Sequence, residues 1–386
     1  MNRKSSRLTK TGIAFLLSFA ATALVWQSGH RAGLEDADAP SPHLTPPAPS
    51  AFTDPATAAL TEGDFARRVA RLTEESRQGG TPAEVRQRSR ALYELARAAH
   101  FQSKGGGQLS LTAYGEALRL SRLAGDRPTE AEILVDQSDT LQLLGQSREA
   151  EVSLRASLAI RDAGVGTAAQ RADALYRLGD FLQARGQHDE ARTTIDRALR
   201  LQQRLGNEPG MADCLRTLGQ SAYEEGSLAL SRQLLGNAIR LFEKHGKIES
   251  RAAVLGQLGD VALREGDVTE AKALYEEGLH VWQERKQGFW TGRFLVRLAN
   301  VALEENDIDR AKELAQKGDR LLSASNGPVV RARALLVLSK VAAREGKQQE
   351  ALRYVSEAEA LYDASGNISG LTECNKVREV LSLSRQ

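Results

Sequence analysis

The sequence predicts an all-α fold in which pairs of helices stack one upon the next, and three observations support this prediction. The 386-residue chain is rich in good helix formers. Only 5% of its residues are aromatic, and aromatic residues are among those that favour β-strands. A sequence pattern recurs every 40 residues. Each copy contains two apolar stripes with helical spacing, separated by a glycine or an asparagine.

The overall composition limits the possible partners and metal sites. Lysine and arginine number 52 against 50 acidic residues, so no strong electrostatic field favours nucleic acid as a partner. The two cysteines, Cys214 and Cys374, lie outside any C-x-x-C pattern and cannot form a metal site by themselves. Since four repeats separate them, no disulfide between them is expected.

Residues 1–29 have the pattern of an N-terminal signal anchor or signal peptide. Four basic residues precede a segment, 11–29, that carries no charge. Ala21-Thr22-Ala23 offers a cleavage site, whereas the apolar run continues to Trp26, as an uncleaved anchor would. Both interpretations predict an exported chain. It would be an inner-membrane protein with a single span and a periplasmic domain, or a periplasmic protein if the signal is removed.

Residues 30–59 contain six of the ten prolines of the chain, in a stretch with few large apolar side chains. This composition predicts a disordered, solvated linker between the N-terminal segment and the repeats. The repeat array is predicted to occupy residues 60–386.

The repeat itself predicts two packed helices and the turn between them. Leu175, Leu178, Gly179 and Leu182 are spaced as one face of a helix, and the same pattern recurs at 215, 255, 295 and 335. A second stripe follows, in which small residues such as Ala191 should let the two helices approach closely. The residue between the stripes should end the first helix in a left-handed turn, at Gly186, Gly226, Gly266, Asn306 and Gly346.

The ends of the array also carry helix signals. Two looser copies of the repeat, near Leu92 and Leu134, precede the five regular ones, which gives about seven helix pairs. A solitary helix is expected over 60–78 and a capping helix over 368–384. Thr81-Pro82-Ala83-Glu84 has the residues of a helix N-cap, a proline at the first helical position and a capping box.

The pattern resembles the tetratricopeptide-repeat signature, W-x2-L-G-x2-Y…A-x3-F. Leu175 stands in place of the tryptophan, Leu178-Gly179 is intact, Leu182 replaces the tyrosine, and Ala191 and Ile195 follow. The usual repeat has about 34 residues, so this chain resembles the long-repeat class of kinesin light chain, LGN-type adaptors and maltose-type activators. The resemblance implies a right-handed superhelical solenoid that binds other proteins.

No motif in the sequence predicts catalysis, a cofactor or a metal. Gly164-Val-Gly166-Thr-Ala-Ala169 formally matches a dinucleotide-binding fingerprint, but a helical stripe precedes it where a strand is required, so we interpret it as a turn. None of the six histidines belongs to a recognisable metal-binding motif. The chain is therefore predicted to be no enzyme, with no catalytic, cofactor-binding or metal-binding residues.

The resemblance implies that the first helix of each pair lines a concave groove. The main hypothesis is a scaffold or adaptor that binds a protein or peptide there and is tethered to the membrane by its N-terminus. The alternative is a ligand-sensing domain with a small-molecule pocket inside the superhelix.

Acidic side chains dominate the first five repeats and basic ones the last two, so a bound segment should take one orientation. The candidate partner-binding residues are Tyr93, Arg97, Asp139, Asp173, Tyr176, Asp180, Asp213, Arg216, Gln220, Tyr223, Asp260, Arg293, Asn300, Arg333 and Lys340. Among them, Tyr93, Tyr176 and Tyr223 are the candidate aromatic anchors.

Overall fold

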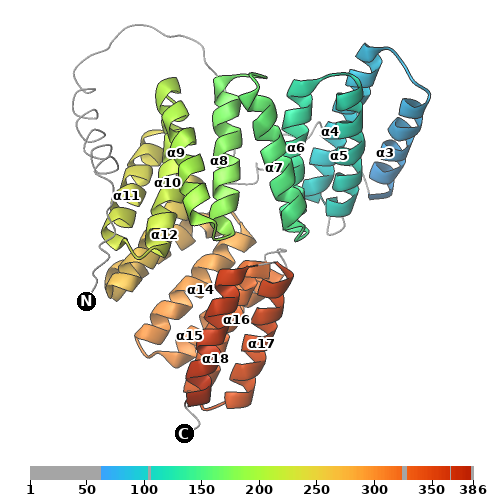
Figure 1. Cartoon of the computed structure of the whole chain (residues 1–386). Coiled ribbons are helices and arrows are strands. Elements are labelled where there is room, and N and C mark those ends of the chain that lie inside the picture. The colour runs from blue at the N-terminus through green and yellow to red at the C-terminus, as the bar shows by residue number, and fades with distance from the viewer. Residues whose placement is uncertain (1–61, 103–105, 324–327, 366, 384–386) are drawn as a thin grey trace, which may run out of the picture. The chain divides into compact units, whose positions relative to one another are not determined.

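The structure is a computed structural model that describes residues 62–102, 106–323, 328–365 and 367–383. The chain divides into two units, residues 1–40 and 41–386, and every described residue belongs to the second. In this described part all regular secondary structure is helical (Figure 1). The helices are α3 (Glu62–Arg77), α4 (Pro82–Gln102), α5 (Gly106–Leu123), α6 (Arg127–Leu143), α7 (Ser147–Asp162), α8 (Ala168–Ala184), α9 (His188–Leu205), α10 (Glu208–Glu224), α11 (Leu228–Lys244), α12 (Ile248–Glu265), α13 (Val268–Glu284), α14 (Gly288–Glu304), α15 (Ile308–Ser323), α16 (Pro328–Arg344), α17 (Gln348–Ala364) and α18 (Ile368–Leu383).

These helices confirm the predicted array of helix pairs with a capping helix at each end. Seven pairs run from α4/α5 to α16/α17, and the two helices of each pair pack against each other. Each pair also packs against the next, so neighbouring helices in sequence are neighbours in space (Figure 1). At the ends, α3 packs on α4 and α5, and α18 packs on α16 and α17. One pair cannot cover its own apolar stripes, so stacking supplies the core.

The first helices lie on the inner side of the array. Successive first helices contact one another from α8 to α16, and α4 contacts α6. Successive second helices, such as α11 and α13, have no comparable contact. Elements that approach more closely lie on the inside of a curve. The weakest junction between first helices is the one between α6 and α8.

Close packing within a pair depends on the predicted small residues. Gly179 lies so near α9 that a Cβ atom there would be 2.5 Å from Ile195 Cδ1. On α9, Ala191 is fully buried, and the corresponding Ala271, Ala311 and Ala351 are also fully buried. The predicted close approach of the two helices is therefore confirmed.

The turns inside the pairs are left-handed at every predicted position. Gly186, Gly226, Gly266 and Gly346 have φ of 77°, 80°, 89° and 76°, and Asn306 has φ of 60°. In the first of these turns the Gln187 N–H donates to Leu182 O at 2.9 Å, which is the long hydrogen bond of a Schellman motif.

The turns between pairs use the same conformation, which the sequence analysis did not predict. Gly206 and Gly246 have φ of 65° and 62°, and Lys286 takes the same position with φ of 53°. Left-handed turns thus recur about every half repeat along the regular part of the array.

Two local sequence predictions are confirmed. Thr81 and Glu84 form the expected capping box, in which Thr81 N–H donates to Glu84 Oε2 at 2.7 Å and Glu84 N–H donates to Thr81 Oγ1 at 3.3 Å. Gly164 and Gly166, with φ of 86° and 89°, lie in the turn between α7 and α8 rather than in a nucleotide-binding loop.

The predicted localisation needs correction. In the ranges that the structure describes, no helix combines the length and the apolar character needed to cross a membrane. This finding contradicts the prediction of a single-pass inner-membrane protein. Residues 1–29, on which that prediction rested, and the proline-rich stretch 30–59 both lie outside the described residues.

Candidate functional site: the inner face of the helix array

All of the candidate partner-binding residues lie on first helices, from α4 to α16. The polar side chains that these helices carry on the inner side of the array are called here the inner face. Most of the candidates are bonded across neighbouring repeats. Four of the others lie on α14 and α16, and the remaining two, Asp173 and Asp213, lie on α8 and α10.

A series of polar bonds joins each first helix to the next along the inner face, and we call it the inner ladder. Each guanidinium in it belongs to one first helix, and the carboxylate that it contacts belongs to an adjacent one. From α4 to α14 the ladder consists of Arg97–Asp136 at 3.2 Å, Arg177–Asp139 at 2.8 Å, Arg216–Asp180 at 3.0 Å, the amide pair Gln257–Gln220 at 3.1 Å, and Arg297–Asp260 at 2.7 Å.

The two members of a ladder pair differ in exposure. The side chains of Arg177 and Arg216 are 13% and 12% exposed, whereas those of Asp139 and Asp180 are 46% and 44% exposed. Asp139 accepts from Arg177, and Asp180 accepts from both Arg216 and Thr217. Because nearly half of each aspartate side chain is exposed, the two carboxylates keep acceptor surface that faces solvent.

Two of the three candidate aromatic anchors are buried. Tyr93 is 9% exposed and donates its hydroxyl hydrogen to Asp136 at 2.8 Å. Tyr176 is 5% exposed, and its hydroxyl oxygen accepts from Arg216 at 2.7 Å. Tyr223 is half-buried, and the guanidinium carbon of Arg264 lies 5.1 Å from its ring centroid. Tyr223 is thus the candidate anchor with the most accessible ring.

Asp173 and Asp213 occupy the same position in successive repeats but have different surroundings. Asp173 accepts from Arg177 at 3.3 Å, one turn along its own helix. Asp213 has a buried Oδ1 atom that finds no hydrogen-bond partner in the described part of the chain. Burial raises the pKa of Asp213 to about 7, although the nearby Arg216 opposes the shift. The buried Nε atom of Arg216 is also without a partner there.

The C-terminal candidates on α14 and α16 are not part of the inner ladder. Asn300 donates to Val296 O within its own helix at 3.4 Å. Arg333 and Lys340 are exposed, and among the described residues neither has a carboxylate partner. Arg293 lies over Trp290, with its guanidinium carbon 4.7 Å from the ring centroid, and likewise contacts no carboxylate in the described ranges.

The sequence analysis missed four residues that shape the inner face: Asp136, Arg177, Arg297 and Trp290. The 40-residue register does contain a signal for two of them. Arg177 and Arg297 stand three residues before Asp180 and Asn300, in the same position of their repeats, so each lies one helical turn from the candidate row. Their pairing with acids of the preceding repeat could not be read from that register.

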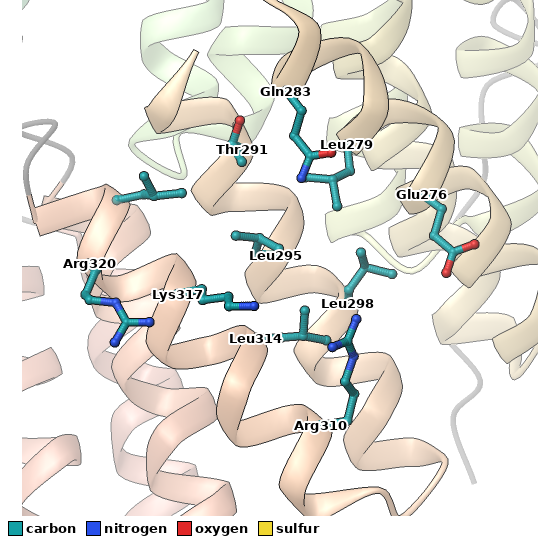
Figure 2. A pocket seen from close by; sticks show the side chains of 11 residues that line it. Glu276, Leu279, Gln283, Thr291, Leu295, Leu298, Arg310, Leu314, Lys317 and Arg320 are labelled. Carbon is teal, nitrogen blue, oxygen red and sulfur yellow. The ribbon is translucent and has the colours of Figure 1, made fainter. Parts of the chain in front are cut away.

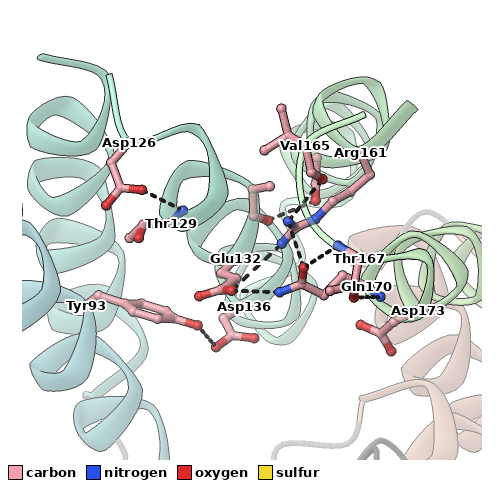
Figure 3. A network of polar contacts seen from close by, with 12 residues as sticks. Tyr93, Asp126, Thr129, Glu132, Asp136, Arg161, Val165, Thr167, Gln170 and Asp173 are labelled. Atoms are coloured by element: carbon pink, nitrogen blue, oxygen red, sulfur yellow. Dashed lines mark hydrogen bonds and ion pairs between the residues drawn. The ribbon is translucent and has the colours of Figure 1, made fainter. Parts of the chain in front are cut away.

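A separate polar network fills the weak junction between α6 and α8 (Figure 3). Arg161, whose side chain is 3% exposed, contacts Gln170 Oε1 at 3.3 Å and Glu132 at 3.9 Å. Gln170 donates to Glu132 at 3.1 Å and also completes a capping box with Thr167 at the start of α8. A side chain at Gly166 would collide with Arg161 and Gln170. These bonds fix the start of α8 against α6 and α7.

A cleft of about 510 Å³ lies on the other side of α14, between α13 and α15 (Figure 2). Thr291, Leu295 and Leu298 form its floor. Because a helix turns once every 3.6 residues or so, these three lie roughly opposite Arg293 and Arg297 on α14. Of the leucines that line the cleft, Leu295, Leu298 and Leu314 are buried, and Leu279 and Leu321 are half-buried.

Comparison with known proteins identifies the repeat type. Two family models match the chain, the MalT-like TPR region over residues 211–385 and the Tetratricopeptide repeat over residues 170–244. Within the described residues, no group of three or more His, Cys, Asp or Glu side chains could hold a metal ion. No curated protein matches the chain.

Solved structures resemble this chain at low sequence identity. Aspartyl phosphate phosphatase F from Bacillus subtilis is 12% identical, with a TM-score of 0.58, over 72% of this chain and 71% of that one. The apo form of RapI is 14% identical, with a TM-score of 0.58, over 72% of this chain and 98% of that one. The TPR-like repeats of a putative kinesin light chain from Podosopora anserina are 19% identical, with a TM-score of 0.39, over 51% of this chain and 97% of that one. At these identities the first two likenesses describe the fold alone.

Proposed function

Because the chain is a tetratricopeptide-repeat protein, we propose that it binds a segment of a protein partner along the inner face of its helix array. Arrays of this kind are protein-interaction scaffolds and are typically non-catalytic. Since the fold alone does not specify which surface binds, the proposal depends on the chemistry of the inner face.

The main support comes from the half-exposed carboxylates of the inner ladder. The side chains of Asp139 and Asp180 are 46% and 44% exposed, and their arginines fix the position of each carboxylate. An extended segment has backbone N–H groups that need acceptors. Acceptors repeated on successive first helices, roughly 10 Å apart, could bind such a segment at several points. Because they are already fixed, binding would cost little side-chain entropy.

Charge polarity supports one direction for the bound segment. At equivalent positions of successive first helices, α6, α8 and α10 carry Glu132, Asp173 and Asp213, whereas α14 and α16 carry Arg293 and Arg333. The basic part of a partner segment would lie over the acidic helices and its acidic part over the basic ones. Complementary charge of this kind chiefly selects orientation and accelerates association.

Site-specific photo-crosslinking tests the proposal. A photoreactive amino acid would replace Asn300 or Lys340 on the inner face, or the exposed Glu276 or Lys317 on the outer side. None of these four belongs to the inner ladder, so the substitutions should leave the fold intact. We expect a protein crosslink in cell extract from the inner positions and none from the outer ones.

Crosslinks of equal strength from the outer positions would contradict the proposal. A specific inner-face crosslink to a small molecule, with no protein attached, would instead favour the sensing alternative. The cleft on the far side of α14 gives that alternative no support, because the alternative places its pocket inside the superhelix and the cleft lies on the other side of α14.

A further inference from the structure

We propose that Arg293 and Arg333 bind the carboxylate of an aspartate or glutamate side chain in the partner segment, an inference that rests on the function proposed above. The two arginines occupy the same position on α14 and α16, one repeat apart. They differ from the arginines of the inner ladder, each of which contacts a carboxylate of this chain.

The guanidinium of Arg293 is positioned by aromatic rings. It lies 4.7 Å from the ring centroid of Trp290 and 5.9 Å from that of Phe289. Trp290 in turn stacks on the fully buried Trp282, with centroids 4.7 Å apart and planes inclined by 12°. A guanidinium stacked by its face on a ring keeps its N–H groups at the edge, where they can donate to a planar anion.

No carboxylate of the described chain forms an ion pair with Arg293. The nearest acid of the inner ladder, Asp260, accepts two bonds from Arg297, at 2.9 and 2.7 Å, and a third from the Tyr275 hydroxyl at 2.8 Å. Arg333 on the next first helix adds a second cation instead of a counterion. The inner ladder therefore ends at Arg297, and beyond it positive charge is left uncompensated.

The electrostatic environment agrees with this geometry. Burial, followed by the like charges of Arg297 and Arg333, lowers the pKa of Arg293 well below its usual range. An isolated buried cation is costly, and an anionic ligand that enters beside it recovers part of that cost. A carboxylate matches the flat, forked geometry of a guanidinium and can accept two parallel bonds from it.

Selection of peptides from a library of random dodecapeptides tests the inference. Against the wild-type chain we expect enrichment of peptides with Asp or Glu at one position. A selected peptide should bind about tenfold tighter than its Gln or Asn counterpart, which corresponds to about 1.4 kcal/mol. In Arg293→Gln that preference should fall to about twofold or less, whereas Arg293→Lys should retain part of it. Thermal melting by circular dichroism would verify that each variant is folded.

A matched control and a second readout make the result specific. Arg320→Gln removes an exposed arginine from the outer cleft and should leave the preference unchanged. Trp290 contacts Arg293, and it is one of only three tryptophans in the chain. Binding of the acidic peptide should therefore change the intrinsic fluorescence, and binding of its neutral counterpart should change it less.

The outcomes separate this inference from the proposed function. If peptides are enriched without any acidic preference, or if the preference survives both Arg293→Gln and Arg333→Gln, the inference is overturned and the proposed function stands. If no peptide is enriched from the library, the proposed function itself is contradicted, and the inference with it.

Discussion

At the scale of single residues, the inner face combines structural and available charges. Asp260 illustrates the structural kind, because it accepts two bonds from Arg297 and one from Tyr275. Arg293 illustrates the available kind, since it has no countercharge bonded to it in the described residues. Similar residue types in similar rows of the repeat can therefore serve stability in one place and binding in another.

Removal of a structural charge should destabilise the array. In Asp260→Ala the guanidinium of Arg297, only 12% exposed, loses its counterion, and the free energy of unfolding should fall by roughly 2–3 kcal/mol. Glu313→Ala is the control, because Glu313 pairs with Arg310 and Lys317, whose side chains are half exposed, and its loss should cost much less. Urea denaturation followed by circular dichroism would measure both. Equal losses in the two variants would mean that Arg297 does not depend on Asp260.

Asp213 should make stability depend on pH. Its pKa is raised by burial to about 7 in the folded chain, above the value of about 3.9 for an unperturbed carboxyl. The folded state therefore binds the proton more tightly, so ionisation of Asp213 lowers stability as pH rises from about 4 to about 7. Asp213→Asn cannot ionise, and its advantage over the wild type should grow through that window by up to roughly 1 kcal/mol per pH unit.

The measurement is the difference in free energy of unfolding between Asp213→Asn and the wild type at several pH values. Above about pH 7 the difference should become constant. A difference that does not change between pH 4 and pH 8 would show that Asp213 is hydrated in the folded chain.

At the scale of the helices and turns, the left-handed turn is the recurring device. It occurs inside the pairs, as at Gly266, and between them, as at Gly206 and Lys286. Glycine adopts this conformation without steric cost, whereas a lysine there brings its Cβ atom close to the backbone. In the turn between α13 and α14, Lys286 thus adopts a backbone conformation that is unfavourable for a residue with a side chain.

Exchange of residues at two such turns should have opposite effects. Lys286→Gly should raise the free energy of unfolding by about 0.5–1 kcal/mol, because it relieves the left-handed conformation at φ of 53°. Gly266→Ala should lower it by about 1 kcal/mol; no atom lies within 4 Å of the added Cβ, so the cost is that of the backbone alone. Thermal melting of the two variants measures both effects, and a lower melting temperature for Lys286→Gly would contradict the expectation.

At the scale of the described array, the junction between α6 and α8 is the weakest one between first helices. One core of buried apolar residues runs from Phe65 to Leu134 together with Ile160, and it ends before α8. At the junction itself, first-helix packing is weak and a polar network around Arg161 takes its place. In a repeat array, stability is set by each unit and its nearest neighbours, so a weak interface is a preferred point of opening.

Limited proteolysis should locate this point. We expect the first cleavage in the turn between Asp162 and Ala168, and Arg161→Ala should accelerate it several-fold by removing the contacts to Gln170 and Glu132. The turn at Gly206 provides an internal comparison, because α8 and α10 pack directly on each other there. Faster cleavage near Gly206 than near Gly164 would show that this junction is not the preferred point of opening.

The sequence by itself determined the features of this protein that depend on neighbours along the chain. The stripes of Leu175, Leu178 and Leu182, the small residues at Gly179 and Ala191, and the glycine or asparagine turns each require only the local backbone, and all are present in the structure. The 40-residue register also placed the candidate residues on first helices, because every repeat folds in the same way.

Only the tertiary structure decided which of those residues bond to one another. Arg216 and Asp180 lie in different repeats, so their contact depends on how far one first helix is displaced from the next and on the side-chain conformations that the packing allows. The same reason explains why Tyr93 and Tyr176 are buried although their positions predict an open face. Arg293 is left beside Trp290 without an acid, because Asp260 is already bound to Arg297.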